Sequence, residues 1–94
     1  MTHNTQTKSS QALDQALQLK MTQRAQATLD LVNLAQARQW AHSQVHDYLG
    51  QNDIANAQQA WLYQQAQAKK MKLQIDRVNH LDHDVVQLVR HQGL

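Results

Sequence analysis

Two histidines four residues apart have the clearest potential for chemistry in this chain. His42 and His46 lie in the segment HSQVH. This spacing places two imidazoles on one face of a helix, where they can bind zinc or another divalent transition metal. A structural or catalytic zinc site needs at least three protein ligands. The pair is therefore an incomplete site by itself.

A second group of possible ligands lies nearer the C-terminal end. Asp76, His80 and either His83 or Asp84 recur at helical spacing. If the chain turns back in its middle, this group lies more than about 10 Å from His42, because each helical residue adds about 1.5 Å. Only an antiparallel dimer brings the two groups together. We therefore expect no metal site and no cofactor. The histidines are expected on exposed helix surfaces, and the first pair is the candidate for a metal.

Residues for acid–base or nucleophilic catalysis do not form a recognisable set. Glutamate is absent, the seven aspartates are scattered, and the chain has no cysteine and no glycine-rich phosphate loop. A thin helical protein also lacks the concave pocket that an enzyme needs. These features predict a protein that is not an enzyme.

The densest positive charge lies at Lys69, Lys70 and Lys72, with Arg77 close behind. Such a cluster can contact phosphates or anionic lipid headgroups. The simpler interpretation is a solvated helix face, because Asp76 partly neutralises the cluster. A net charge of +2 is too small for a dedicated nucleic-acid surface.

The two tryptophans have two interpretations. Aromatic side chains can stack on bases. However, helical periodicity puts Trp61 in the predicted contact between helices and Trp40 close to it. We expect both to anchor a core or an interface, and we expect no specific nucleic-acid partner.

Two long helices must carry these residues. The chain contains no proline, and Gly50 is its only glycine apart from one near the C-terminus. Proline breaks helix interiors and glycine weakens them. The sequence therefore predicts an all-α protein in which helices at about 10–49 and 53–91 form a long antiparallel hairpin. We expect Gly50 to supply a left-handed residue at the turn and Asn52 or Asp53 to cap the second helix.

Small, apolar and a few polar residues recur every three or four positions in both halves, which is typical of one buried stripe on each helix. The first predicted stripe is Leu13, Leu17, Met21 or Lys20, Arg24, Ala27, Leu31, Leu34, Arg38, Ala41, Val45 and Tyr48. The second is Ile54, Ala57, Trp61, Gln64, Ala68, Met71, Ile75, Val78, Asp82 or Leu81, Val85 and Val89. Folding the chain at the turn pairs Lys20 with Asp82, and Arg38 with Gln64.

A broken form of the hairpin is the alternative. Thr28 and Asn79 can each serve as an N-cap for a new helix. Breaks at these residues would give a compact monomeric bundle of three or four helices.

A single hairpin has more apolar residues than one contact between helices can use. The additional ones lie beside the two stripes: Leu29, Val32, Leu62, Ala66, Leu73, Leu81 and Leu88. Wide apolar faces need another layer, and a second copy is the economical source of one. We expect these residues to form the interface of a coiled-coil-like homodimer, in which two hairpins make a four-helix bundle. The alternative is that the surface tolerates them.

Two resemblances to known families concern limited features. The segment Asp53-Ile54-Ala55-Asn56-Ala57, after a glycine-containing turn, resembles the Gly-Asp-Phe-x-x-Ala turn of lactose/cellobiose-type phosphotransferase IIA proteins. Alignment from this segment places Lys72 where that family has its phosphorylated histidine. The resemblance therefore implies a degenerate IIA-like helical protein without phosphocarrier activity. In size, basic pI and helical content the chain is also similar to bacteriocin immunity proteins. That resemblance implies a small membrane-associated accessory protein in the form of a four-helix bundle.

The ends of the chain complete the expected organisation. Residues 1–9 are polar and predict a disordered tail before a single helical domain at 10–94. Ser10 is the expected N-cap of the first helix, and Gly93 the expected C-terminal glycine of the second. We find no signal peptide, no membrane span and no cysteine, and we therefore expect a cytoplasmic protein. The expected function is a non-enzymatic interaction or self-assembly module, which binds a second copy or a helical partner.

Overall fold

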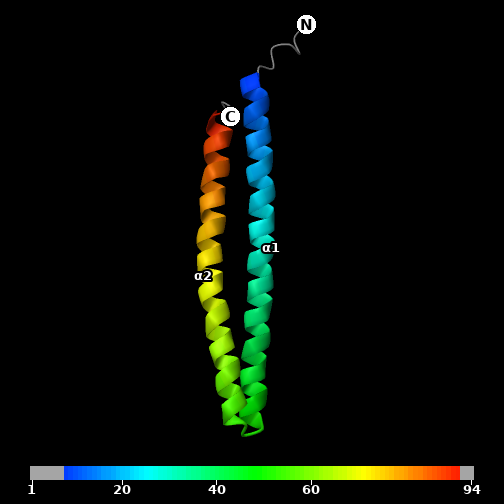
Figure 1. The fold of residues 1–94 in the computed structure, drawn as a ribbon, viewed down its shortest axis with the longest axis vertical. Helices are drawn as coiled ribbons and strands as arrows, with labels where there is room; N and C mark the ends of the chain where they lie inside the picture. Colours follow the sequence, from blue (N-terminus) through cyan, green and yellow to red (C-terminus); the bar gives the residue numbers. More distant parts are fainter. Residues whose placement is uncertain (1–7, 92–94) are drawn as a thin grey trace.

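Two antiparallel helices make up the part of the chain that the structure, a computed structural model, describes (residues 8–91). Helix α1 spans Lys8–Gly50 and helix α2 spans Ile54–His91 (Figure 1). Within residues 8–91 there is no strand. The predicted long hairpin is confirmed. Residues 1–7 and 92–94 lie outside the described residues, and with them most of the predicted tail and Gly93.

Both helices run without a break, so the compact bundle of three or four helices is wrong. The hydroxyl of Thr28 donates to the carbonyl oxygen of Arg24 at 2.9 Å, four residues back. This hydroxyl therefore bonds back to a carbonyl within the same helix and caps no new one. Asn79 lies inside α2, and Ser10 lies inside α1 because that helix begins at Lys8. With no proline or glycine nearby, nothing in the backbone favours a break at these residues.

The end of α1 is closed by hydrogen bonds in the pattern of a Schellman motif. The N–H of Asp53 donates to the carbonyl of Tyr48 at 2.8 Å, and the N–H of Asn52 donates to that of Leu49 at 3.1 Å. Asn52 is the left-handed residue that this motif needs, with φ of 56°. The expectation that Gly50 takes this conformation is wrong, because Gly50 is the last helical residue and a Cβ there would meet nothing within 4 Å.

Asp53 caps α2 as the sequence predicts. Its Oδ1 accepts the backbone N–H of Asn56 at 3.2 Å, and its Oδ2 accepts the side-chain amide of Asn56 at 2.7 Å. The carbonyl of Asp53 also accepts the N–H of Ala57 at 3.0 Å, the first bond of the helix. One residue thus completes the end of α1 and starts α2.

Small and amide side chains line the contact between the helices. Ala27, Ala41 and Ala57 are buried there, together with Gln67 at 5% exposure and Leu81 at 8%. Ala27 and Ala41 are fourteen residues apart, and so are Gln67 and Leu81. The contact therefore keeps a seven-residue repeat along both helices, as two helices wound gently around each other do.

The rotation of α2 differs from the predicted stripe. Trp61 and Ile75, expected inside the contact, are 51% and 44% exposed, and Ile54 is exposed as well. Gln67 lies in the contact in their place, and Leu81, the stated alternative to Asp82 in the predicted stripe, is buried there as well. Alanines on α1 allow a close approach of the two helices, and bulky side chains are displaced to the side of such a contact.

The molecule is a thin rod. Its Cα atoms extend over 76 × 18 × 16 Å with a radius of gyration of 21.3 Å, against roughly 12 Å for a compact domain of this length. No large side chain among the described residues is fully buried. The hairpin by itself therefore has very little hydrophobic core.

Candidate functional site

One side of the hairpin carries an apolar hollow close to the turn. Its lining comes from both helices: Val45, Leu49, Ile54, Ala57, Gln58 and Trp61. Leu49, Ile54 and Trp61 are exposed, and Val45 is half-buried. Bulky apolar side chains thus meet at the surface, whereas the contact between the helices holds alanines.

The seven-residue repeat extends this apolar surface along the rod. Residues separated by multiples of seven stay on the same side of such a contact. On α1, Leu17 and Leu31 have this spacing from Val45, and Met21 has it from Leu49. On α2, Ile75 and Val89 have this spacing from Trp61, and Val86 has it from Gln58. We call this surface the Trp61 face: Leu17, Met21, Leu31, Val45, Leu49, Ile54, Trp61, Ile75, Val86 and Val89.

Two ion pairs between described residues join the helices near the open end. Arg24 Nε pairs with Asp82 Oδ1 on the Trp61 face, and Lys20 Nζ lies 3.2 Å from Asp84 Oδ2. The predicted pair of Lys20 with Asp82 is wrong. Because Leu81 occupies the contact, Asp82 is turned to the side where Arg24 meets it.

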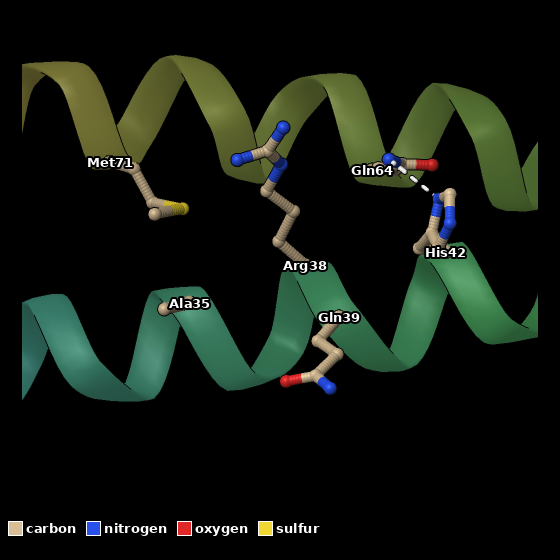
Figure 2. A pocket seen from close by; sticks show the side chains of 6 residues that line it. All are labelled: Ala35, Arg38, Gln39, His42, Gln64 and Met71. Carbon is tan, nitrogen blue, oxygen red and sulfur yellow. Dashed lines mark hydrogen bonds between the residues drawn. The ribbon is translucent and has the colours of Figure 1, made fainter.

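Arg38 forms the other basic layer of the same face. It lines a hollow together with Ala35, His42, Gln64 and Met71. Figure 2 shows the guanidinium of Arg38 reaching from α1 toward α2, between Gln64 and Met71. Among residues 8–91 no ion pair involves Arg38. The predicted partner, Gln64, shares this hollow, but its amide lies against His42 instead, with Gln64 Nε2 3.3 Å from His42 Nδ1.

The histidine pair at residues 42 and 46 is closely spaced. The Nε2 atoms of His42 and His46 are 3.2 Å apart, and their ring centroids are 4.7 Å apart at an interplanar angle of 77°. Both side chains are exposed. Within residues 8–91 no cluster of three or more His, Cys, Asp or Glu side chains is arranged to hold a metal.

The second group of possible ligands is engaged elsewhere. His80 Nδ1 lies 2.8 Å from the carbonyl oxygen of Asp76, and Asp84 pairs with Lys20. The two histidine groups lie toward opposite ends of the rod, since His42 and His46 are near the turn and His80 and His83 are in the second half of α2. One hairpin does not bring them together.

The two tryptophans lie on different sides of the hairpin. Trp40 meets Tyr63 edge to face, with ring centroids 6.2 Å apart, beside a hollow that both residues line with Gln44 and Tyr48. Trp61 belongs to the opposite side, with Ile54. Sequence periodicity placed Trp61 in the contact itself and therefore missed the face it belongs to. The seven-residue spacing from Trp61 to Ile75 was the available signal.

The predicted interface residues are divided by the structure. Leu81 is buried between the helices and Leu88 is half-buried. The others are exposed: Leu29, Val32, Leu62, Ala66 and Leu73. Leu29 lies about 200° around α1 from buried Ala27, and Leu62 about 140° around α2 from buried Gln67. They point away from the hairpin in opposite directions, so one flat partner cannot cover both. Their role in an interface stays a prediction.

The basic cluster lies along α2. Lys69, Lys70, Lys72 and Arg77 are all exposed, and within the described range none of them forms an ion pair. Leu73, the most exposed large apolar side chain at 72%, lies among the lysines.

Together these observations define the class of the protein: an all-α, two-helix antiparallel hairpin with an alanine-lined helix contact and with exposed apolar side chains, several of them on the Trp61 face. Comparisons with protein-family models, with curated proteins and with solved structures give no match. Neither described helix has an apolar stretch long enough to cross a bilayer.

Proposed function

We propose that this protein is a non-enzymatic self-assembly module whose Trp61 face binds the same face of a second copy, giving a four-helix coiled-coil bundle. The observation that carries the proposal is the distribution of side chains. Alanines and an amide fill much of the contact within the hairpin, whereas Trp61, Ile54, Leu49 and Ile75 are exposed on one side of it. Bulky apolar residues gathered on one surface are typical of an interface.

The exposed area supports a partner of the size of a second hairpin. The chain exposes 7231 Å², whereas a compact protein of 10.8 kDa exposes roughly 5,500 Å². The excess is about 1,700 Å² per chain, about twice the ~800 Å² that each partner contributes to a typical specific interface. A second copy can cover such an area along the whole rod, and a small ligand cannot.

The order of residues on the Trp61 face supports an antiparallel arrangement of the two hairpins. At seven-residue intervals α1 presents Leu17, Arg24, Leu31, Arg38 and Val45, an order that is symmetric about Leu31. A two-fold axis at that level puts Arg38 of each chain next to the Arg24–Asp82 pair of the other chain. A parallel dimer would instead place Arg38 against its own copy, without the Asp82 carboxylate beside it.

Sedimentation equilibrium over a range of protein concentrations tests this proposal. We expect a dimer for the unchanged chain, and we expect Trp61→Asp to shift it to monomer because a carboxylate would be buried in the interface. Leu62→Asp is the matched control, because it places the same charge one residue away on the outer surface. A monomer at all concentrations refutes self-association. If the dimer persists in Trp61→Asp but is lost in Leu62→Asp, the interface lies on the outer surfaces of the helices and not on the Trp61 face.

A second candidate function is peripheral binding to anionic membranes. Leu73 projects from a group of lysines without ion pairs in the described range, an arrangement that combines apolar insertion with attraction to lipid headgroups. Co-sedimentation with vesicles rich in phosphatidylserine tests it. Binding should weaken with salt and with the double substitution Lys69→Gln/Lys72→Gln, and no binding at low salt would exclude this function.

A further inference from the structure

The histidine pair that the sequence indicated as a candidate for a metal has its two Nε2 atoms close together in the structure. His42 Nε2 and His46 Nε2 face each other at 3.2 Å on the exposed surface of α1. Zinc–nitrogen bonds of 2.0–2.1 Å put two ligand nitrogens about 3.3–3.4 Å apart at a tetrahedral angle, and about 2.9 Å apart at a right angle. The observed separation falls between these two values. The separation of the two nitrogens therefore matches that of two ligands on one ion, which would replace the hydrogen bond between the two rings.

We propose that His42 and His46 chelate one divalent transition metal ion through their Nε2 atoms. The site needs no second copy for its ligands, because both come from a single helix of one chain, although His42 also lines the Arg38 hollow on the Trp61 face. With two protein ligands, water completes the coordination. Imidazole nitrogen suits Cu²⁺, Ni²⁺ and Zn²⁺, whereas Mg²⁺ prefers oxygen ligands.

Gln64 on the facing helix orients one of the two ligands. Its side-chain amide lies against Nδ1 of His42, the ring nitrogen not used for the metal, at 3.3 Å (Figure 2). A metal-bound histidine donates its other ring N–H to an oxygen. A half-turn of the Gln64 amide exchanges its nitrogen and oxygen, and Oε1 then accepts that proton. Gln64 is thus a positioning residue, and it connects a metal held by α1 to α2.

Binding to this site has a structural consequence that a surface pair on an isolated helix would not have. Ordering His42 in the orientation that contacts Gln64 strengthens an interhelical hydrogen bond. Because the ion binds the folded hairpin better than the unfolded chain, it raises the stability of the hairpin by mass action. Removing Gln64 should therefore reduce this stabilisation as well as the affinity.

Calorimetric titration with ZnCl₂ tests the site. The background carries His3→Ala, because this histidine lies outside the described residues and its imidazole could compete for the metal. We expect one Zn²⁺ per chain, at least a tenfold weaker affinity in His42→Ala and in His46→Ala, and about a tenfold loss in Gln64→Ala. Gln64→Glu, which keeps an oxygen acceptor, should restore binding. MgCl₂ should give no heat of binding.

His80→Ala is the matched control, because His80 is an exposed α2 histidine bonded to a backbone carbonyl. Its affinity for Zn²⁺ should equal that of the background chain. Circular dichroism establishes that every variant stays helical. Absence of Zn²⁺ binding in the background chain overturns the proposal, and so does binding that survives His42→Ala and His46→Ala. If the affinity for Zn²⁺ falls in His42→Ala and in His46→Ala but not in Gln64→Ala, the site lies on α1 alone and Gln64 does not position its ligand.

Discussion

The side-chain amide of Gln74 on α2 donates a hydrogen bond of 2.9 Å to the backbone carbonyl of Ala27 on α1. This bond crosses the contact between the helices more than twenty residues away from the turn along each chain. It therefore fixes the axial register of the helices far from the residues that connect them. A polar side chain is well suited to this task, because its bond has a preferred length and direction that apolar packing lacks.

Replacing Gln74 by methionine should lower the free energy of unfolding by about 1 kcal/mol, the usual net value of one hydrogen bond. The loss stays modest because the carbonyl of Ala27 keeps its bond within α1. Urea unfolding at a fixed protein concentration measures it. Gln36→Met, at an exposed α1 position seven residues from the outward-pointing Leu29, is the control and should change stability much less. Equal effects would show that the bond to Ala27 does not hold the helices together.

Alanine at Gly50 and alanine at Asn52 should have opposite effects on the stability of the protein. Gly50 is helical and has open space around it, so Gly50→Ala should stabilise the protein by about 0.5–1 kcal/mol. Asn52 is left-handed, so Asn52→Ala should destabilise it by about 1 kcal/mol. Thermal unfolding compares the two variants. Asn52→Gly should be at least as stable as the unchanged chain, and a destabilising Gly50→Ala would contradict the assignment of these roles.

Removing the cap of α2 should cost about 1 kcal/mol. Asp53→Ala deletes the oxygen that accepts the backbone N–H of Asn56, a loss of the usual size for an N-cap. Asp53→Asn keeps an oxygen in the same place and should retain most of the stability. Hydrogen exchange of the first-turn amides of α2 reports the same event locally, since those amides should lose protection in Asp53→Ala alone.

The close approach of the helices predicts intolerance to a larger side chain at Ala41, which is 0% exposed. Ala41→Leu should destabilise the hairpin by about 1–3 kcal/mol through overpacking. Ala55→Leu adds the same atoms at an exposed position of α2 and should change stability by less than about 0.5 kcal/mol. Chemical denaturation of both variants, again at matched protein concentration, separates packing from a general effect of hydrophobicity.

Spin labels distinguish the proposed antiparallel dimer from a parallel one. The chain has no native cysteine, so one cysteine at residue 72 or residue 58 can be labelled singly. Both positions border the Trp61 face. With a two-fold axis near the middle of α2, labels at residue 72 lie close together, and labels at residue 58 lie about 42 Å apart along the rod. Short distances at both positions would establish the parallel arrangement instead.

Much of the hairpin could be predicted because its determinants are local. The absence of proline and the single central glycine predicted two unbroken helices, and the acidic cap at Asp53 marked the start of the second. The left-handed residue was misassigned because glycine and asparagine both adopt that conformation. Which of Gly50 and Asn52 does so depends on where the last turn of α1 ends.

The rotation of α2 could not be predicted in the same way. Its apolar residues follow two overlapping stripes, one with Trp61 and Ile75 and one with Leu81 and Leu88. When the two stripes are compared by the hydrophobicity of their residues, the one with Trp61 is predicted to lie in the contact between the helices. The alanines of α1 favour a contact too narrow for it, and this preference arises from the shape of the facing helix. The Trp61 face was missed for the same reason.

Both described helix ends, at Lys8 and His91, lie at the end of the rod that is remote from the turn (Figure 1). In the proposed antiparallel dimer, the two copies of this end point in opposite directions. Segments attached to the termini of one chain would then be separated from those of the other by the full length of the rod, roughly 60 Å for helices of this size. Such a dimer would hold these segments at a fixed separation, which is set by the number of helical residues between the open end of the hairpin and the turn at Asn52.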